Sequence, residues 1–320
     1  MRITEKTIPG LLDALDSVKK ELSEKEPEKY PFGEWERKRA VVKERLRNLP
    51  DYVGRAAGMI KIVKGPGQPK KMDLSKRTLL FIFARMMDKS NRDMEYMLNI
   101  FGPLFDVDVS YKYIERLYSD EEVEMTLHNL LILLLQNESV SGNFSGDGTG
   151  YTLSVARHYR TNPEKSGKRG YLYAFRLIDI DTGLYVALGY SSKSEMDAFN
   201  KAMKMLGALG IRIDSISLDR YYSSRKVLQI FDRETSVYVI PKKNLSNVGC
   251  YWAKILKRIS ENPEEYVRRY AKRNLSESGF SADKRRFGWK IRQKRDDRRE
   301  MAIFSIGLLH NIFTVKVKVG

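Results

Sequence analysis

The hydrophobic pattern of this chain changes its period near residue 140, and no other feature of the sequence limits the fold as much. Before that point apolar residues recur at helical spacing, and after it short runs alternate as they do in strands. The chain has 320 residues, which suffices for one large domain or two moderate ones. We therefore predict a helical N-terminal part followed by a part built on a sheet.

The helical part divides into two regions. Residues 1–64 are predicted to form charged helices, the first of which Thr7 can cap. The segment 64–71 combines Gly and Pro with Lys, a composition typical of a linker. Residues 65–139 then form the second helical region.

A helix-turn-helix is one interpretation of this second region. Ser90 opens a helix that Gly102-Pro103 is expected to end, and Ser110 caps the next helix after a short turn. That next helix groups basic and aromatic side chains, as DNA recognition helices do. The side chains that we expect to recognise specific DNA ends are Tyr111, Lys112, Tyr113 and Arg116. A plain helical bundle with the same surface explains the pattern equally well.

Residues 140–320 are predicted to form a mixed five-stranded sheet with flanking helices. Three strands, the last two joined by a turn at Asp181-Thr182-Gly183, come first. A helix capped by Ser194 follows, and then a strand, a helix, a strand and a helix that begins at Pro263. This order is that of a ribonuclease H-like α/β domain, which by itself says little about chemistry.

Three acidic residues lie where such a fold would gather them. Asp147 lies on the first strand, Asp219 ends the fourth, and Glu277 lies on the helix that begins at Pro263. Carboxylate oxygens are the ligands that Mg²⁺ and Mn²⁺ prefer, and two such ions can activate water for attack at phosphorus. The chain has 41 Asp and Glu, so strand position alone favours this grouping only modestly.

The predicted helix carries a stripe of functional side chains. Tyr270, Arg273, Glu277 and Lys284 fall on one face if the helix continues past Gly279. Such a face combines a metal-binding carboxylate with two phosphate-binding cations and an aromatic ring. A solvated charged stripe is the alternative.

These residues resemble a known family. Tyr270, Arg273, Glu277 and Lys284 have the spacing of the signature of DDE-type insertion-sequence transposases of bacteria and archaea. The run Asp147-Gly148-Thr149-Gly150 resembles the first-strand motif of that family. Asp219-Arg220-Tyr221-Tyr222-Ser223 resembles its second motif, with Tyr221 where glycine is common.

The resemblance implies roles for particular residues. Asp147, Asp219 and Glu277 would be catalytic and would hold two Mg²⁺ or Mn²⁺ ions. The residues expected to bind DNA phosphates are Tyr270, Arg273, Lys284, Arg285 and Arg286. Some relatives insert a large β-rich domain before the Glu-bearing helix, but the segment between Ile240 and Asn262 is too short to hold one. The only tryptophan in that segment, Trp252, is expected to be core.

Charge supports a nucleic-acid partner. The formal net charge is +17, and residues 254–299 hold 16 Lys and Arg against seven Asp and Glu. A basic wall around an acidic metal centre can hold a DNA backbone near carboxylates that would otherwise repel it. Aromatic residues among these charges, Trp289 included, could stack on unpaired bases.

Other classes of protein are excluded or disfavoured. The single cysteine rules out an intramolecular disulfide framework and a cysteine-based zinc site, and three scattered histidines disfavour a Ser-His-Asp enzyme. No apolar run reaches the length of a membrane span, so we expect no membrane partner and a cytoplasmic, nucleoid-associated protein.

The sequence thus predicts a transposase that binds the terminal inverted repeats of a mobile element and catalyses metal-dependent cleavage and strand transfer. Its partners would be double-stranded DNA, at both the element ends and the target, and a second copy of the chain in a homodimer or higher multimer. Two alternatives stay open: a non-catalytic DNA-binding protein derived from a transposase, and a structure-selective nuclease with the same core.

Overall fold

The computed structural model describes residues 7–23, 32–61, 70–105, 107–153, 170–242, 245 and 248–314. Before the sheet, these residues form the helices α1 (Ile8–Ser23), α2 (Phe32–Arg47), α3 (Leu49–Gly58), α4 (Leu74–Met86), α5 (Asn91–Phe105), α6 (Tyr111–Leu117) and α7 (Glu121–Gln136). The predicted linker and the boundary between residues 64 and 65 lie largely outside the described residues.

The N-terminal helices follow local sequence signals closely. Ser110 caps α6 by accepting a hydrogen bond from the Tyr113 amide at 3.4 Å, as its position predicts. The prediction that Gly102-Pro103 ends the preceding helix is wrong, because α5 continues to Phe105. Proline removes an amide donor and crowds the preceding turn, and α5 ends two residues beyond it.

The sheet confirms the predicted strand order. It contains β1 (Asn143–Leu153), β2 (Tyr171–Asp179), β3 (Tyr185–Ser191), β4 (Ser215–Leu218) and β5 (Ser236–Tyr238), in the order β3-β2-β1-β4-β5. The first three strands pair antiparallel, whereas β4 pairs parallel to β1 and to β5. This is the mixed five-stranded sheet of a ribonuclease H-like domain.

The first strand is longer than predicted. We expected it to end at Asp147, but β1 runs on to Leu153. Its second half pairs with β2 and also with the short strand β6 (Lys290–Ile291). Backbone pairing with β2 therefore keeps the glycine-rich segment after Asp147 extended, and β6 adds pairing only at Thr152 and Leu153.

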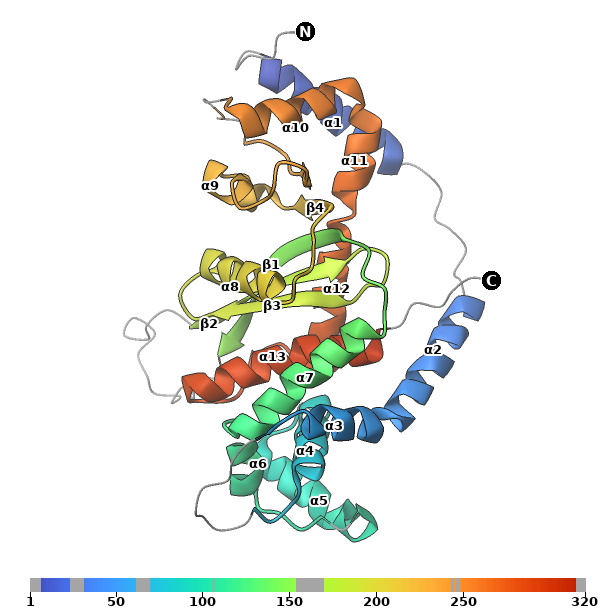
Figure 1. The fold of residues 1–320 in the computed structure, drawn as a ribbon, viewed down its shortest axis with the longest axis vertical. Helices are drawn as coiled ribbons and strands as arrows, with labels where there is room; N and C mark the ends of the chain where they lie inside the picture. The colour runs from blue at the N-terminus through green and yellow to red at the C-terminus, as the bar shows by residue number, and fades with distance from the viewer. Residues whose placement is uncertain are drawn as a thin grey trace, which may run out of the picture.

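Helices cover both faces of the sheet (Figure 1). They are α8 (Glu195–Ala208), α9 (Arg225–Leu228), α10 (Cys250–Glu261), α11 (Pro263–Ala271), α12 (Asn274–Phe287) and α13 (Asp296–Phe313). The segment expected to lack a β-rich insertion contains α10, which the sequence pattern left unassigned. Trp252 of α10 is buried, as predicted for a core residue.

One long helix from Pro263 through Lys284 was predicted, and that prediction is wrong. The chain forms two helices, with a break at Lys272 and Arg273. The break lets α11 pack on β4 and β5 while α12 packs on β1 and β2. A straight helix could not follow both pairs of strands, because strands in a sheet are rotated relative to one another.

The last helix, α13, joins the N-terminal helices to the sheet. Residues 301–312 of α13 are all buried. Arg85 of α4 donates a hydrogen bond to the Ser305 hydroxyl at 3.0 Å. Arg45 of α2 donates to the carbonyl groups of Asn311 at 2.8 Å and Thr314 at 2.6 Å, where a cation stabilises the helix C-terminus. No helix in the described part of the chain is long and apolar enough to cross a membrane.

A buried charge network fixes α12 against the sheet. Asp283 of α12 is 2% exposed and accepts hydrogen bonds from Arg176 on β2 and, at 2.9 Å, from the Tyr185 hydroxyl on β3. Nδ1 of His310 on α13 lies 2.7 Å from its other oxygen. Arg176 also donates to the Tyr151 hydroxyl at 3.0 Å. Burial alone would raise the pKa of Asp283, but His310 and Arg176 hold it below its ordinary value.

We expect Asp283→Asn to lower the free energy of unfolding by about 3–5 kcal/mol, because it leaves the Arg176 charge buried without a partner. Urea unfolding monitored by circular dichroism measures this loss. The depressed pKa of Asp283 means that its contribution is present at neutral pH and is lost as the pH falls below its ordinary pKa of 3.8. The difference from wild type should therefore narrow there. Asp296→Asn, at a side chain that is 80% exposed, should change stability by less than about 0.5 kcal/mol.

Candidate active site

Two aspartates follow paired positions on neighbouring parallel strands. Gly146 of β1 lies opposite Leu218 of β4 in the sheet, and Asp147 and Asp219 are the next residues on each strand. Adjacent strands lie about 4.8 Å apart, so the two aspartates are close neighbours in the sheet, although β1 itself continues to Leu153. Asp147 is half-buried, and the Asp219 side chain is 37% exposed.

The third predicted acid comes from the helix that packs across these strands. The hydroxyl groups of Ser145 on β1 and Ser276 on α12 form a hydrogen bond of 2.7 Å, and both residues are completely buried. Ser145 lies two residues before Asp147, and Ser276 immediately precedes Glu277. This contact therefore holds the backbone of α12 against β1 at the point where Glu277 begins to project.

A single cation links the acids. A guanidinium nitrogen of Arg273, at the break between α11 and α12, lies 2.6 Å from a Glu277 oxygen and 3.5 Å from an Asp219 oxygen. The pKa of Asp147 is raised to about 6, chiefly by burial; the charges of Asp219 and Glu277 add to the rise, whereas the Gly148 amide and Arg273 oppose it. The three carboxylates thus share one electrostatic neighbourhood.

The donor set suits a hard divalent cation, although the acids are not drawn tightly together. Among the described residues, no group of three or more His, Cys, Asp or Glu side chains is close enough to hold a metal ion. Arg273 supplies the positive charge between Asp219 and Glu277 instead. All three candidates are carboxylates, the ligands that Mg²⁺ and Mn²⁺ prefer, and the Glu277 side chain is 51% exposed.

The predicted phosphate-binding residues divide into two groups. Lys284 of α12 reaches β1, where its ammonium donates to the Thr149 hydroxyl at 2.7 Å, two residues beyond Asp147. Arg285 and Arg286 are exposed on the last turn of α12. Tyr270, at the end of α11, is only 8% exposed, and the Arg273 guanidinium lies 5.4 Å from its ring centre. Tyr270 and Arg273 therefore lie on the Asp219 side of the site, and Lys284 lies along β1.

A glutamate that the sequence analysis did not single out connects the two aspartate motifs. Glu195, the first residue of α8, accepts a hydrogen bond of 2.6 Å from the Tyr222 hydroxyl, and Tyr222 belongs to the second motif. Its carboxyl group also packs against Gly148 of the first motif so closely that a Cβ there would overlap it. Ser194-Glu195-Met196-Asp197 was interpreted only as a helix cap, and no sequence signal marks this contact.

The candidates for end recognition lie apart from these acids. Figure 1 shows α6 at the lower end of the molecule, below α7 and α13. Lys112 and Arg116 are exposed, and the Arg92 guanidinium lies 5.4 Å from the centre of the Tyr111 ring. The Tyr113 hydroxyl is buried and has no hydrogen-bond partner among the described atoms. The structure thus brings these four residues together with one another but not with Asp147.

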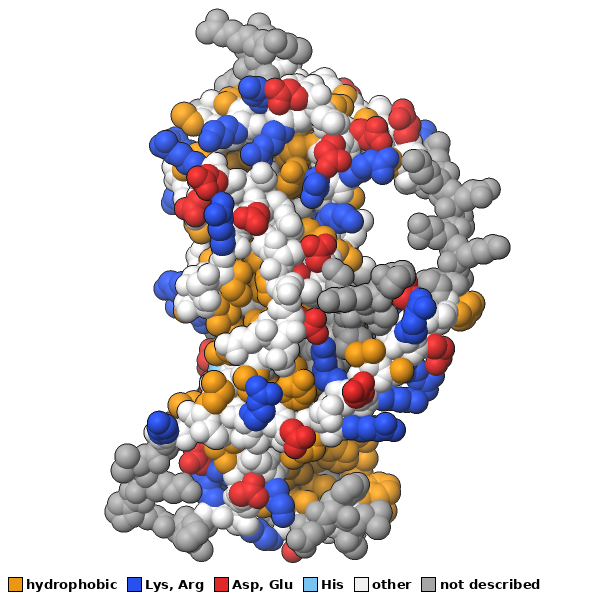
Figure 2. Space-filling model, turned by 45° about the vertical axis from the view of Figure 1, so that its right-hand side comes forward, with side chains coloured by type: hydrophobic (Ala, Val, Ile, Leu, Met, Phe, Trp, Pro, Cys, Tyr) orange, Lys and Arg blue, Asp and Glu red, His pale blue; other side chains and the backbone are white. Residues whose placement is uncertain are grey.

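On the face shown in Figure 2, positive charge does not form one patch. Figure 2 shows Lys and Arg side chains along the full length of one face, interspersed with acids. The aromatic residues within the basic segment 254–299 are mostly core: Tyr266, Phe280 and Phe287 are at most 5% exposed, whereas Trp289 is 55% exposed. Of these four, only Trp289 is free to stack on a base.

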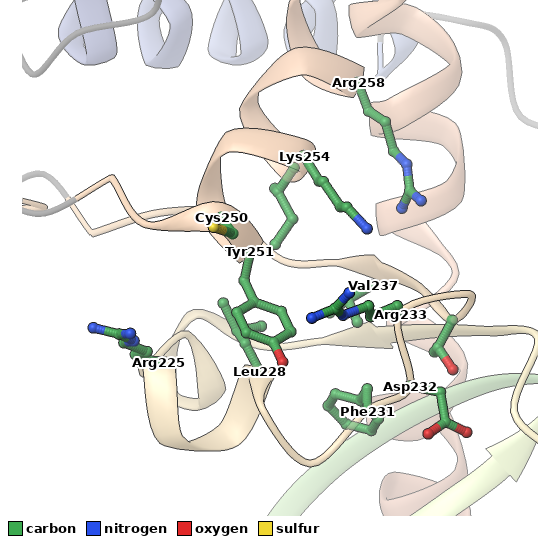
Figure 3. A pocket seen from close by; sticks show the side chains of 12 residues that line it. Arg225, Leu228, Phe231, Asp232, Arg233, Val237, Cys250, Tyr251, Lys254 and Arg258 are labelled. Atoms are coloured by element: carbon green, nitrogen blue, oxygen red, sulfur yellow. The ribbon is translucent and has the colours of Figure 1, made fainter.

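Two cavities lie at opposite ends of the edge strand β5. The larger, of about 730 Å³, adjoins Asp219 and includes Tyr270 and Arg273. The smaller, of about 330 Å³, lies between α9, β5 and α10 and contains none of the predicted site residues. Figure 3 shows the side chains of Tyr251 and Arg233 reaching into this second cavity.

Comparisons with known proteins identify the family. No protein-family model matches the chain. A protein of Archaeoglobus fulgidus named "Probable transposase for insertion sequence element ISA1214" is 61% identical over 316 residues, which cover 99% of this chain and 98% of that protein.

A solved structure, a piggyBac transposase synaptic complex with hairpin DNA, is 6% identical with a TM-score of 0.42 and covers 84% of this chain and 71% of that one. That likeness is too distant to bear on residue roles. By contrast, the 61% identity with the Archaeoglobus fulgidus protein extends over 99% of this chain and 98% of that one. The match therefore covers essentially the whole of both chains. The chain belongs to the family of insertion-sequence transposases.

Proposed function

We propose that this transposase is of the DDE type and moves its element by cutting it out and joining its ends to target DNA. The strand register supports this most strongly, because Asp147 and Asp219 each follow a paired residue, Gly146 of β1 and Leu218 of β4, on neighbouring parallel strands. In the first reaction water attacks the scissile phosphorus and releases a 3′-hydroxyl. In the second, that hydroxyl attacks a target phosphodiester, so one P–O bond forms for each that breaks.

The proposed cofactor is a pair of Mg²⁺ or Mn²⁺ ions. When bound, they would polarise the scissile phosphate and lower the pKa of water. Asp147, Asp219 and Glu277 offer the carboxylate oxygens that would hold them. Arg273 now pairs with two of these acids, so its guanidinium has to leave Glu277 before that carboxylate can act as a ligand. A released Arg273 is then available to bind a DNA phosphate.

The partners that we propose are the element ends, target DNA and further copies of the chain. Lys284, Arg285 and Arg286 would bind phosphates along the extension of β1, and α6 would recognise the terminal repeats. Coupling two ends requires at least two active sites, so the working form is proposed to be a dimer or a higher multimer. The nucleoid-associated location stays a prediction.

Replacing any one of Asp147, Asp219 and Glu277 with Ala should lower Mg²⁺-dependent cleavage at least about 100-fold. Removing a residue that only hydrogen-bonds to a metal ligand already lowers metal affinity or activity roughly 10- to 100-fold. Gel assays on labelled DNA that borders the gene measure cleavage. DNA affinity should be retained, since these acids repel phosphate when no metal is bound.

The matched control for these variants is Glu234→Ala, at an exposed acid whose ion pair within the described part of the chain is with the exposed Arg212. Cleavage by this control should equal wild type. If all three single variants still cleave, the catalytic assignment is wrong. If wild type binds DNA but never cleaves it, the protein is the non-catalytic alternative, and cleavage without joining of paired ends indicates the nuclease.

DNA affinity should fall steeply with salt, because each phosphate that the protein neutralises releases counterions. Lys284→Ala and Arg285→Ala should each reduce the slope of log affinity against log salt by about one. Fluorescence anisotropy on a duplex of arbitrary sequence measures the slope. Lys204→Ala, at an exposed lysine of α8, should leave it unchanged. An affinity that does not respond to salt would exclude the proposed contacts.

Lys112→Ala and Arg116→Ala should reduce the preference for the element ends over unrelated DNA. A base contact that is lost costs about 1–3 kcal/mol of discrimination, while general affinity changes little. Competition binding with both DNAs measures the ratio. Lys89→Ala, in the exposed segment between α4 and α5, is the control. An unchanged ratio in both variants favours the plain helical bundle.

A further inference from the structure

We propose that the cavity between α1 and the break separating α11 from α12 is a subsite for the DNA strand next to the scissile phosphate, and that Lys19 of α1 binds a backbone phosphate there. This inference rests on the proposed function and deepens it. It assigns a role at the catalytic centre to the first helix of the chain, which the sequence placed in a separate N-terminal region.

The cavity is continuous with the candidate catalytic centre. Its volume is about 730 Å³, within the range of about 300–1,000 Å³ that ligand pockets occupy. Asp219 and Arg220 form one part of its wall, and Tyr270 and Arg273 form another. Lys19 and Leu22 close it from the side of α1. A strand whose phosphate lies at Asp219 can therefore extend into this cavity.

Lys19 interrupts the apolar stripe by which α1 packs on α11. Ile8, Leu12 and Leu15 on this stripe are buried, and the next positions at the same spacing are Lys19 and Leu22. The methylene stem of a lysine can lie on the apolar surface of such a stripe, but its ammonium requires water or a polar or charged partner. Lys19 stands in place of an apolar residue at the point where the stripe passes over the cavity. This position indicates that Lys19 binds a ligand in the cavity.

The aromatic ring of Tyr270 lies between two cations. The Lys19 ammonium is 5.7 Å from the ring centre, and the Arg273 guanidinium is 5.4 Å from it. Because Tyr270 is only 8% exposed, the ring is not a free surface for base stacking. It acts as a spacer that holds both charges at the edge of the cavity.

The charges of the lining favour a phosphodiester backbone over other occupants. Lys19, Arg220 and Arg273 supply three positive charges against the single carboxylate of Asp219. Lys19 also pairs with Asp16 at 3.1 Å, but Asp16 is 71% exposed and an exposed pair of this kind contributes little. A DNA phosphate can therefore replace Asp16 as the partner of Lys19.

The test pairs protein variants with single uncharged phosphates. The probe is a nicked duplex made from the DNA that borders the gene, with one methylphosphonate placed in turn at each position beside the nick. Binding to full-length wild type should weaken roughly 10- to 100-fold at one position, since a charge-assisted hydrogen bond is lost there. Lys19→Ala should bind the unmodified probe as weakly as wild type binds that methylphosphonate probe, with no further loss when both changes are combined.

Two further variants separate a phosphate contact from a structural role. Lys19→Arg should restore affinity and the dependence on that one phosphate, because it keeps the charge. Lys20→Ala, on the same helix but outside the cavity lining, should behave as wild type. Thermal unfolding should be the same for Lys19→Ala and wild type.

The proposal is wrong if the loss of affinity caused by Lys19→Ala adds to the loss caused by the methylphosphonate at every position tested. Tighter binding or faster cleavage by Lys19→Ala would also overturn it, because α1 would then cover the site instead of holding DNA. These binding measurements are made without metal. Failure of the Lys19 proposal is therefore distinct from failure of the proposed function. If the proposed function is wrong, wild-type protein binds the probe but does not cleave DNA when Mg²⁺ is added.

Discussion

The buried carboxylate of Asp283 ties together β2, β3, α12 and α13, and the geometry of the site depends on it. Its partners Arg176, Tyr185 and His310 come from three different elements. A buried acid tolerates few arrangements, because each unpaired oxygen or cation is costly in a low dielectric. The network therefore fixes how α12 is rotated on the sheet. Glu277 lies less than two turns before Asp283 on the same helix, so its direction toward the aspartates follows from that rotation.

Charge balance gives the catalytic candidates their second constraint. Burial raises the pKa of Asp147, and repulsion from the carboxylates of Asp219 and Glu277 adds to this rise. Arg273 relieves the repulsion by pairing with Glu277 and Asp219 from the break between two helices. The break thus serves two purposes. It lets α11 and α12 follow differently directed strands, and it frees the guanidinium to lie between the acids. The same residue is then suited to exchange its acid partners for DNA.

Much of the fold could be predicted because its signals are local. Caps at Ser110, Ser194 and Asn262 mark helix starts that the structure confirms, and strand alternation gave the order of the sheet. The same order made Asp147 and Asp219 neighbours on parallel strands, as the register shows, while the convergence of all three acids on one metal site stays a prediction. The end of β1, helix α10 and the break near Arg273 were missed or wrong. Each depends on what the segment packs against, which local propensity does not encode.

The sequence by itself determined the motifs that resemble the family, the net positive charge and the elements that carry the three acids. Motif spacing, composition and periodicity are all properties of the chain alone. Only the tertiary structure decided which distant residues meet at the site. Glu195 packs on Gly148 and holds Tyr222, and Lys19 faces Tyr270 across a cavity. Neither contact leaves a spacing pattern, since the partners lie far apart in the chain and are brought together by helix packing on the sheet. The physical reason is that packing, unlike periodicity, is a relation between segments.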